Sequence, residues 1–237
     1  MAKEKQLTIS NPSIGGSGYL TLSNMEADTA IQAGFHAAIH QCRGLAQAGG
    51  PLCVDVMIRE REVKGSIPHH VDYINGYDLS EAWRAVFTAG DFTASFPRGL
   101  TVVADFYVDE PILVTGTRKG HRYLTREEYL GRFEEVKDSG GDLRLVFYDY
   151  KKHKLRNILK GPFSLGVIAA DLNIRQDDRF IILPKKAAIE GILNNVPKMK
   201  NPAADAKIRK LNRDVFESGY AAREQFAGAW DARVILI

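Results

Sequence analysis

Hydrophobic and polar residues alternate along three stretches of the chain, and a period of two is typical of strands with one buried face. The three stretches are residues 52–63, 100–108 and 142–150. Residues 163–170 are apolar except for Ser164, which predicts a central strand that is covered on both faces. Shorter runs predict further strands at residues 5–10, 19–22, 112–115, 180–183 and 233–237. The pattern therefore predicts a protein built around a sheet.

Helical periodicity and helix-end signals predict the other elements. Residues 25–48 are rich in Ala and stop at a pair of glycines. Thr125 and Glu128 form a capping box ahead of a helix that reaches residue 138. Further helices are predicted at residues 80–89, 185–195 and 202–228.

These elements predict an α+β fold in one domain, residues 1–237. We expect a mixed, mostly antiparallel sheet flanked by four or five helices, with a long C-terminal helix. The alternative organisation has two sub-lobes, an acidic one at residues 1–150 and a basic one at residues 151–237.

The composition is that of an ordinary globular protein. The chain has 237 residues, of which 45% are hydrophobic, so it can bury a substantial core. Its two cysteines cannot form a disulfide framework, and a reducing, cytoplasmic location is therefore expected. The start of the chain is polar, and no run approaches the roughly 18 apolar residues that a membrane span needs.

The positive charge is concentrated in one part of the chain. Residues 151–213 carry fifteen Lys or Arg and five Asp or Glu, whereas the net charge of the whole chain is only +3. Cations for phosphates next to aromatic rings for stacking are what a nucleic-acid surface needs. The first hypothesis is therefore a protein that binds DNA or RNA. Its predicted contact residues are Tyr148, Tyr150, Lys151, Lys152, Lys154, Arg156, Lys160, Lys185, Lys186, Lys198, Lys200, Arg209, Lys210 and Arg213.

A second hypothesis is a structural or assembly subunit that binds an acidic protein partner through the same basic surface. A homo-oligomer or a multi-subunit complex is compatible with either hypothesis. Neither hypothesis calls for a membrane.

The third hypothesis is a metal-dependent nuclease or another hydrolase. His36 and His40 are four residues apart on the predicted helix and so share a face, which makes them weak candidates for metal ligands. Glu62 and Lys64 match half of a metal-dependent nuclease signature.

No complete catalytic or cofactor motif is present in the sequence. The glycine-rich stretch at residues 11–18 lacks the ending of a P-loop and the spacing of a dinucleotide fingerprint, so it is interpreted as a flexible connection. The sequence therefore favours a protein that is not an enzyme and predicts no cofactor, although active sites also assemble from distant residues.

Overall fold

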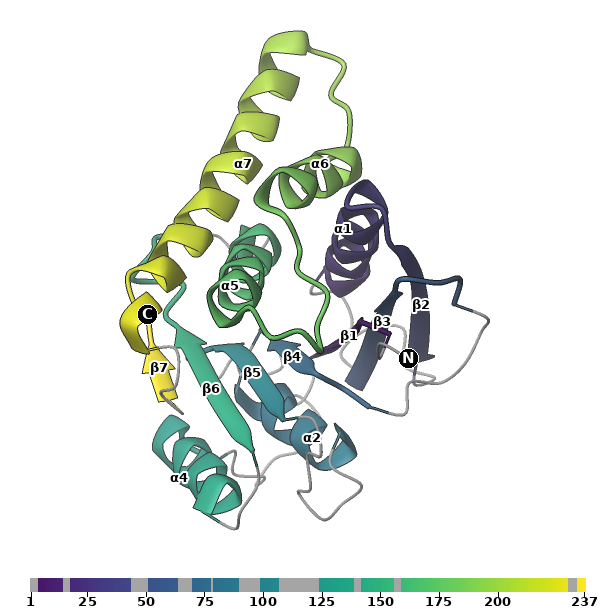
Figure 1. Cartoon of the computed structure of the whole chain (residues 1–237). Coiled ribbons are helices and arrows are strands. Elements are labelled where there is room, and N and C mark those ends of the chain that lie inside the picture. The colour runs from purple at the N-terminus through teal and green to yellow at the C-terminus, as the bar shows by residue number, and fades with distance from the viewer. Residues whose placement is uncertain are drawn as a thin grey trace.

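Seven strands form one sheet at the centre of the molecule (Figure 1). The computed structural model describes residues 4–14, 18–43, 51–63, 70–77, 79–89, 99–106, 124–138, 142–155, 159–229 and 234–237. The strand order is β2-β3-β1-β4-β5-β6-β7. The strands are β1 (Gln6–Ile14), β2 (His36–Arg43), β3 (Pro51–Arg59), β4 (Tyr73–Gly76), β5 (Leu100–Asp105), β6 (Leu143–Tyr148) and β7 (Val234–Leu236).

Five strands are parallel, and β2 and β3 form an antiparallel hairpin beside β1. The predicted mixed sheet with flanking helices and a long C-terminal helix is confirmed. Four of its six strand pairings are parallel, a larger share than predicted. The physical reason is that helices connect β4 to β5, β5 to β6 and β6 to β7, and a helical crossover joins parallel neighbours.

The helices cover both faces of the sheet and make a three-layer arrangement (Figure 1). One face is covered by α1 (Tyr19–Gln32) and α5 (Lys160–Arg175), and α6 (Lys185–Asn195) and α7 (Pro202–Glu224) pack on the outer side of these two helices. The other face packs against α2 (Leu79–Ala89) and α4 (Arg126–Asp138). In the described part of the chain, no helix combines the length and the apolar character that crossing a bilayer requires.

Several predicted elements are confirmed by the structure. The capping box forms as expected, because the Thr125 amide donates to Glu128 Oε2 at 2.7 Å and the Glu128 amide donates to Thr125 Oγ1 at 3.2 Å. Helix α6 has the predicted bounds, and α7 begins at the predicted Pro202. The end of the chain adds β7 to the sheet, beside β6.

Two predictions about the first third of the chain are wrong. Residues 19–22 belong to helix α1 and not to a strand, and the predicted helix at 25–48 ends at Gln32. Gly34 has a φ of 85°, a left-handed conformation that ends the helix and turns the chain into β2. His36 and His40 therefore lie on a strand.

The predicted central strand at residues 163–170 is also wrong, because this segment is the middle of α5. Every residue from Lys160 to Leu172 is buried, since the helix lies between the sheet and helices α6 and α7. A helix that is apolar on all sides gives the same continuous hydrophobic run as a central strand. Residues 180–183 form no strand, and the predicted strand at 112–115 lies outside the described residues.

Helices α5 and α7 cross at two glycines. A Cβ atom at Gly166 would collide with the backbone carbonyl of Phe216, and a Cβ atom at Gly219 would collide with that of Phe163. Gly131 in α4 has open space around the same position. The helices can therefore approach closely only because two facing positions lack side chains.

We expect Gly166→Ala and Gly219→Ala each to lower the free energy of unfolding by about 1–3 kcal/mol, because the two helices must move apart. The matched control is Gly131→Ala, which is expected to be neutral or to stabilise by about 0.5–1 kcal/mol. Urea unfolding of the three variants measures the difference. Equal effects at all three glycines would contradict the close crossing.

Candidate functional site

The carboxyl ends of the parallel strands lie together at one edge of the sheet, which we call the carboxyl edge. Tyr77 follows β4, and Asp105 ends β5. Helices α1 and α5 begin at this edge, at Tyr19 and Lys160. The chain continues from β1 to the β2–β3 hairpin on one side, whereas β4 to β7 lie on the other. Ligands of open α/β sheets bind outside such a reversal of strand order, so this edge is the candidate site.

Lys160 is the central charged group of the carboxyl edge, although it is only 2% exposed. Its Nζ lies 2.7 Å from Asp105 Oδ2 and donates to the carbonyl of Tyr77 at 3.3 Å. The same ammonium lies 4.0 Å from the centre of the Tyr150 ring. A cation at the start of a helix is unfavourable for the helix dipole, so the buried carboxylate must offset that cost. Lys160 thus ties the start of α5 to the ends of β4 and β5.

Two tyrosines in ring-to-ring contact lie beside Lys160 at the edge. The ring centroids of Tyr19 and Tyr77 are 3.9 Å apart, and the ring planes are tilted by 36°. The Tyr19 hydroxyl donates to the carbonyl of Asn75 at 3.1 Å and accepts from the backbone amide of Tyr77. Gly161 is needed here because a Cβ atom at that position would lie 2.7 Å from the Tyr77 hydroxyl. Burial raises the pKa of Tyr77 far above its usual value, so the phenol is neutral.

Glu26 holds α1 against the sheet from within the core. It is fully buried and accepts hydrogen bonds from Asn11 Nδ2 at 2.7 Å and Asn75 Nδ2 at 3.1 Å. Burial raises the pKa of Glu26 to about 8, and the two amide hydrogen bonds lower it only in part. The carboxyl group is therefore mainly protonated at pH 7. Because Asn11 is on β1 and Asn75 on β4, this contact spans the reversal of strand order.

Lys160 and Glu26, the two ionisable groups described above, already have partners within the protein. Lys160 is held by a carboxylate, a carbonyl and a ring, and Glu26 is enclosed by two amides. Such an arrangement fixes geometry and charge and is suited to binding. Groups held in this way are poor candidates for a free nucleophile or a general base.

The predicted nucleic-acid contact residues are not equivalent in the structure. Tyr148 and Lys160 are buried, and Arg209 donates to Asp205 and to the carbonyl of Leu193. Arg156 lies outside the described residues. Tyr150 is partly buried. The predicted contacts that are exposed are Lys151, Lys152, Lys154, Lys185, Lys186, Lys198, Lys200, Lys210 and Arg213.

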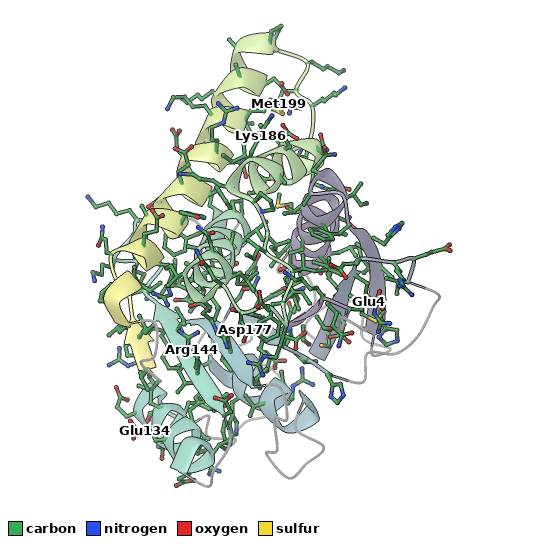
Figure 2. All side chains as sticks on the ribbon, viewed as in Figure 1. Glu4, Glu134, Arg144, Asp177, Lys186 and Met199 are labelled. Carbon is green, nitrogen blue, oxygen red and sulfur yellow. The ribbon has the colours of Figure 1, made fainter. Side chains whose placement is uncertain are left out.

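The exposed cations come from two separate parts of the fold. Lys151, Lys152 and Lys154 follow β6, whereas the other six lie on α6, on α7 or between them. Lys186 and Met199 mark the end of the molecule formed by α6 and α7, away from the sheet (Figure 2).

The two weak metal candidates lie on strand β2. The spacing of four residues keeps His36 and His40 on one face, as it does on a helix, because strand residues alternate. His40 Nδ1 lies 3.6 Å from Asp55 Oδ2 on β3. Among the residues that the structure describes, no three His, Cys, Asp or Glu side chains are arranged to hold a metal ion. Lys64 of the nuclease half-signature is outside the described residues.

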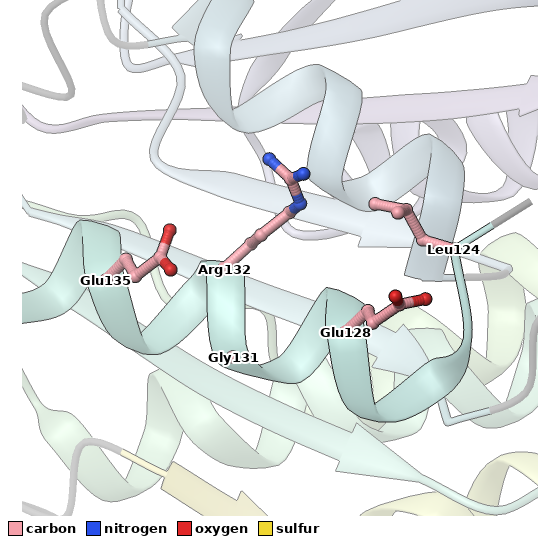
Figure 3. A pocket seen from close by; sticks show the side chains of 5 residues that line it. All are labelled: Leu124, Glu128, Gly131, Arg132 and Glu135. Atoms are coloured by element: carbon pink, nitrogen blue, oxygen red, sulfur yellow. The ribbon is translucent and has the colours of Figure 1, made fainter.

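Helix α4 carries a shallow hollow on its surface (Figure 3). Its lining consists of Leu124, Glu128, Gly131, Arg132 and Glu135. Glu128 already serves the capping box, and Arg132 and Glu135 are exposed. The hollow is an open surface on one helix, so the carboxyl edge remains the better candidate.

The sequence reasoning missed the residues that build the carboxyl edge. The sequence does contain a hint of Glu26. The residue stands between apolar residues on a predicted helix, where an acid is either exposed or buried in its neutral form. Asp105 also carried a signal, because it is an acid within an alternating stretch that is otherwise rich in apolar residues. The pairing of Asp105 with Lys160 had no local signal, since the two are far apart in the sequence.

Fold and site together define a three-layer α/β protein whose candidate binding edge lies at the carboxyl ends of parallel strands. The chain belongs to the pyruvate ferredoxin/flavodoxin oxidoreductase family, because the model of that family matches residues 9–222. No curated protein sequence matches the chain.

Solved structures of oxidoreductase subunits resemble the chain over almost their whole length. A pyruvate oxidoreductase subunit from Thermotoga maritima is 16% identical with a TM-score of 0.58, covering 92% of this chain and 96% of that one. The gamma subunit of a keto/oxoacid ferredoxin oxidoreductase from Geobacter sulfurreducens is 18% identical with a TM-score of 0.59, covering 94% and 98%. At such identities the likeness concerns the fold.

A third similar structure is a longer chain. The 2-oxoglutarate:ferredoxin oxidoreductase from Magnetococcus marinus, with 2-oxoglutarate, coenzyme A and succinyl-CoA bound, is 15% identical with a TM-score of 0.58. The match covers 94% of this chain and 32% of that one. The same fold therefore occurs as a separate subunit and as one part of a larger chain.

The prediction of a nucleic-acid-binding protein is wrong. The family is one of oxidoreductases, and the same finding removes the nuclease hypothesis. A charge surplus describes long-range attraction and solubility, and it does not identify a partner. The expectation of a multi-subunit complex agrees with the relatives, two of which are subunits of oxidoreductases.

Lys160→Met is expected to lower the free energy of unfolding by about 3–5 kcal/mol, because it leaves the Asp105 carboxylate buried without its cation. Adding Asp105→Asn removes that charge and should recover most of the loss. Lys200→Met at an exposed position is the control and should change stability by less than about 0.5 kcal/mol. Urea unfolding distinguishes the three; a double variant as unstable as the single one would contradict the pairing.

The protonation state of the buried Glu26 carboxyl group can be tested by measuring how the stability of Glu26→Gln and of the wild type depends on pH. Glu26 has a raised pKa, so between about 4.5 and about 8 the folded protein holds a proton that the unfolded chain has released. The stability of the wild type should therefore fall through this window, by at most about 1.4 kcal/mol per pH unit. Glutamine mimics the neutral acid, so the variant should match the wild type below about pH 4.5 and exceed it near pH 8. A stability difference that stays constant between these pH values would contradict a neutral Glu26.

Proposed function

We propose that the chain is a gamma-type subunit of a multi-subunit oxidoreductase that oxidises a 2-oxo acid and passes the electrons to ferredoxin or flavodoxin. The observation that carries the proposal is that the family model and two oxidoreductase subunits match almost the whole chain. The family model matches residues 9–222, and the chain aligns with at least 96% of two separate oxidoreductase subunits. A chain that merely contained a common α/β fold would not be expected to match one family from end to end.

The longer Magnetococcus enzyme supports the idea of a complex. This chain corresponds to 32% of that protein. We infer that separate subunits take the place of the parts of the Magnetococcus chain that this chain does not match. The chain by itself is then a part of an enzyme, and its contribution is a binding surface.

We assign that contribution to the carboxyl edge. The ligands named for the Magnetococcus structure, 2-oxoglutarate, coenzyme A and succinyl-CoA, are all anions. Helices α1 and α5 begin at the edge, and helix N-termini favour anionic groups. Lys160 and Asp105 neutralise each other there, so the backbone amides of the helix starts face no uncompensated acid from this pair. The edge therefore suits an anionic part of such a ligand.

The test is purification of the native complex through an affinity tag on this chain. We expect further subunits to co-purify, and we expect the complex to reduce ferredoxin or a low-potential dye with pyruvate or 2-oxoglutarate as the electron donor and coenzyme A present. The isolated chain is the control and should be inactive. A tagged chain that is isolated alone, from cells whose 2-oxo acid oxidation does not depend on it, would overturn the proposal.

A further inference from the structure

The loop between α6 and α7 and the start of α7 project from the body of the molecule (Figure 1). We call residues 197–211 the arm. No residue of the arm is buried, and the buried residues of α7 begin at Asn212. Among the apolar residues of the arm, Ile208 packs partly against the core. The arm is therefore a helical segment that extends beyond the core and stays accessible.

The arm is held in shape by its own polar contacts. The Asn201 side chain caps α7 by accepting from two backbone amides of the first turn, at 2.9 and 3.3 Å. Asp205 accepts from the Met199 amide at 2.9 Å and from Arg209 Nε at 2.7 Å. Arg209 also donates to the carbonyl of Leu193 on α6 at 2.9 Å, which ties the two helices together. The arm is thus shaped before any partner binds, and a pre-formed surface loses less entropy on binding.

The surface of the arm combines positive charge with exposed apolar side chains. Its five Lys or Arg outnumber its single acid. Lys198, Lys200 and Lys207 are exposed and form no ion pair with the residues that the structure describes. Met199 and Leu211 are 45% and 44% exposed. Methionine is enriched in protein–protein interfaces, where it adapts its shape to the partner.

A charge surplus alone does not identify a partner, but the arm adds two further observations. Its helix begins outside the core, and large apolar side chains are exposed on it. Both are typical of a surface that another protein covers. Charge complementarity then requires that the covering surface is acidic.

We propose that the arm docks onto an acidic surface of another subunit of the same complex, with Met199 as an apolar anchor and carboxylates opposite the lysines of the arm. That this partner is an oxidoreductase subunit rests on the proposed function. The arm lies at the end of the molecule away from the sheet (Figure 2), so this contact is separate from the carboxyl edge.

Charge reversal on the arm tests the contact in the native complex, purified through an affinity tag on this chain. We expect Lys200→Glu/Lys207→Glu to lower the amount of the other subunits recovered per tagged chain about tenfold at roughly 0.15 M salt, because attraction becomes repulsion. The matched control is Arg61→Glu/Arg132→Glu, which makes the same change of charge at exposed positions outside the arm and should behave as the wild type. Circular dichroism should show that both variants are folded, since all four positions are exposed.

Zero-length cross-linking of the wild-type complex gives a second reading. A carbodiimide joins a lysine to a carboxylate only where the two are in contact. We expect mass spectrometry to find links from Lys198, Lys200 or Lys207 to Asp or Glu residues of another subunit. Met199→Asp should weaken the complex as the charge reversal does, whereas Met199→Leu should keep it.

The outcomes separate this inference from the proposed function. A charge-reversed arm that recovers the other subunits as fully as the wild type overturns the inference and leaves the proposed function intact. A wild-type chain that is isolated alone overturns the proposed function, and this partner with it. Sedimentation of the isolated chain identifies a different occupant: self-association that the charge reversal abolishes would assign the arm to a second copy of the chain, against the proposal.

Discussion

The position of helices α5 and α7 on the sheet depends on the hydrogen bonds and ion pairs of one buried carboxylate, that of Asp171. It accepts from the Tyr73 hydroxyl at 2.7 Å and from Arg223 Nε at 2.8 Å, and Arg144 Nη1 lies 3.3 Å away. These partners come from β4, α7 and β6, and Arg175 extends the network to Thr101 on β5. Removing one member of such a buried network leaves the other charges uncompensated. The Asp171 network therefore fixes α5 and α7 on the sheet.

Helix α5 is fixed at both ends by charge and in between by apolar packing. Lys160, the first residue of α5, pairs with Asp105, and Asp171 lies near the last turn of the helix. Tyr73 and Arg144 lie at the beginning of their strands, whereas Asp105 lies at the end of β5. The two polar clusters are thus at opposite edges of the sheet, and the length of α5 separates them. A helix held in this way has little freedom to slide, so its N-terminus keeps a fixed place at the carboxyl edge.

Elements with a strong local pattern could be predicted from the sequence. The alternation at 100–108 and 142–150 became β5 and β6, and the capping box at Thr125 and Glu128 started α4, because both signals act between near neighbours. The apolar run at 163–170 was ambiguous, since burial on all sides hides the difference between helix and strand. Only the packing of α5 between the sheet and α7 decides it.

The carboxyl edge was not predictable for a related reason. Counting charge treated Lys160 as one of fifteen cations in a basic region, although its side chain is inside the protein and belongs to Asp105. Similarly, Glu26 meets Asn11 and Asn75 only after α1 has packed across β1 and β4. Contacts of this kind follow from strand order, and no residue pattern within one segment encodes strand order.

The carboxyl edge contains buried polar groups where apolar side chains could have packed, and this arrangement supports the binding role that we propose for it. A buried ion pair is often no more stabilising than hydrophobic residues of the same size, so stability alone does not account for Lys160 and Asp105. What the pair gives is position, because the ammonium simultaneously contacts Asp105, the Tyr77 carbonyl and the Tyr150 ring. Glu26 does the same for α1 by bridging two strands. Both helix starts are then placed before any ligand arrives, which lowers the entropic cost of binding. A pre-formed edge of this kind fits the binding role that we propose for this chain.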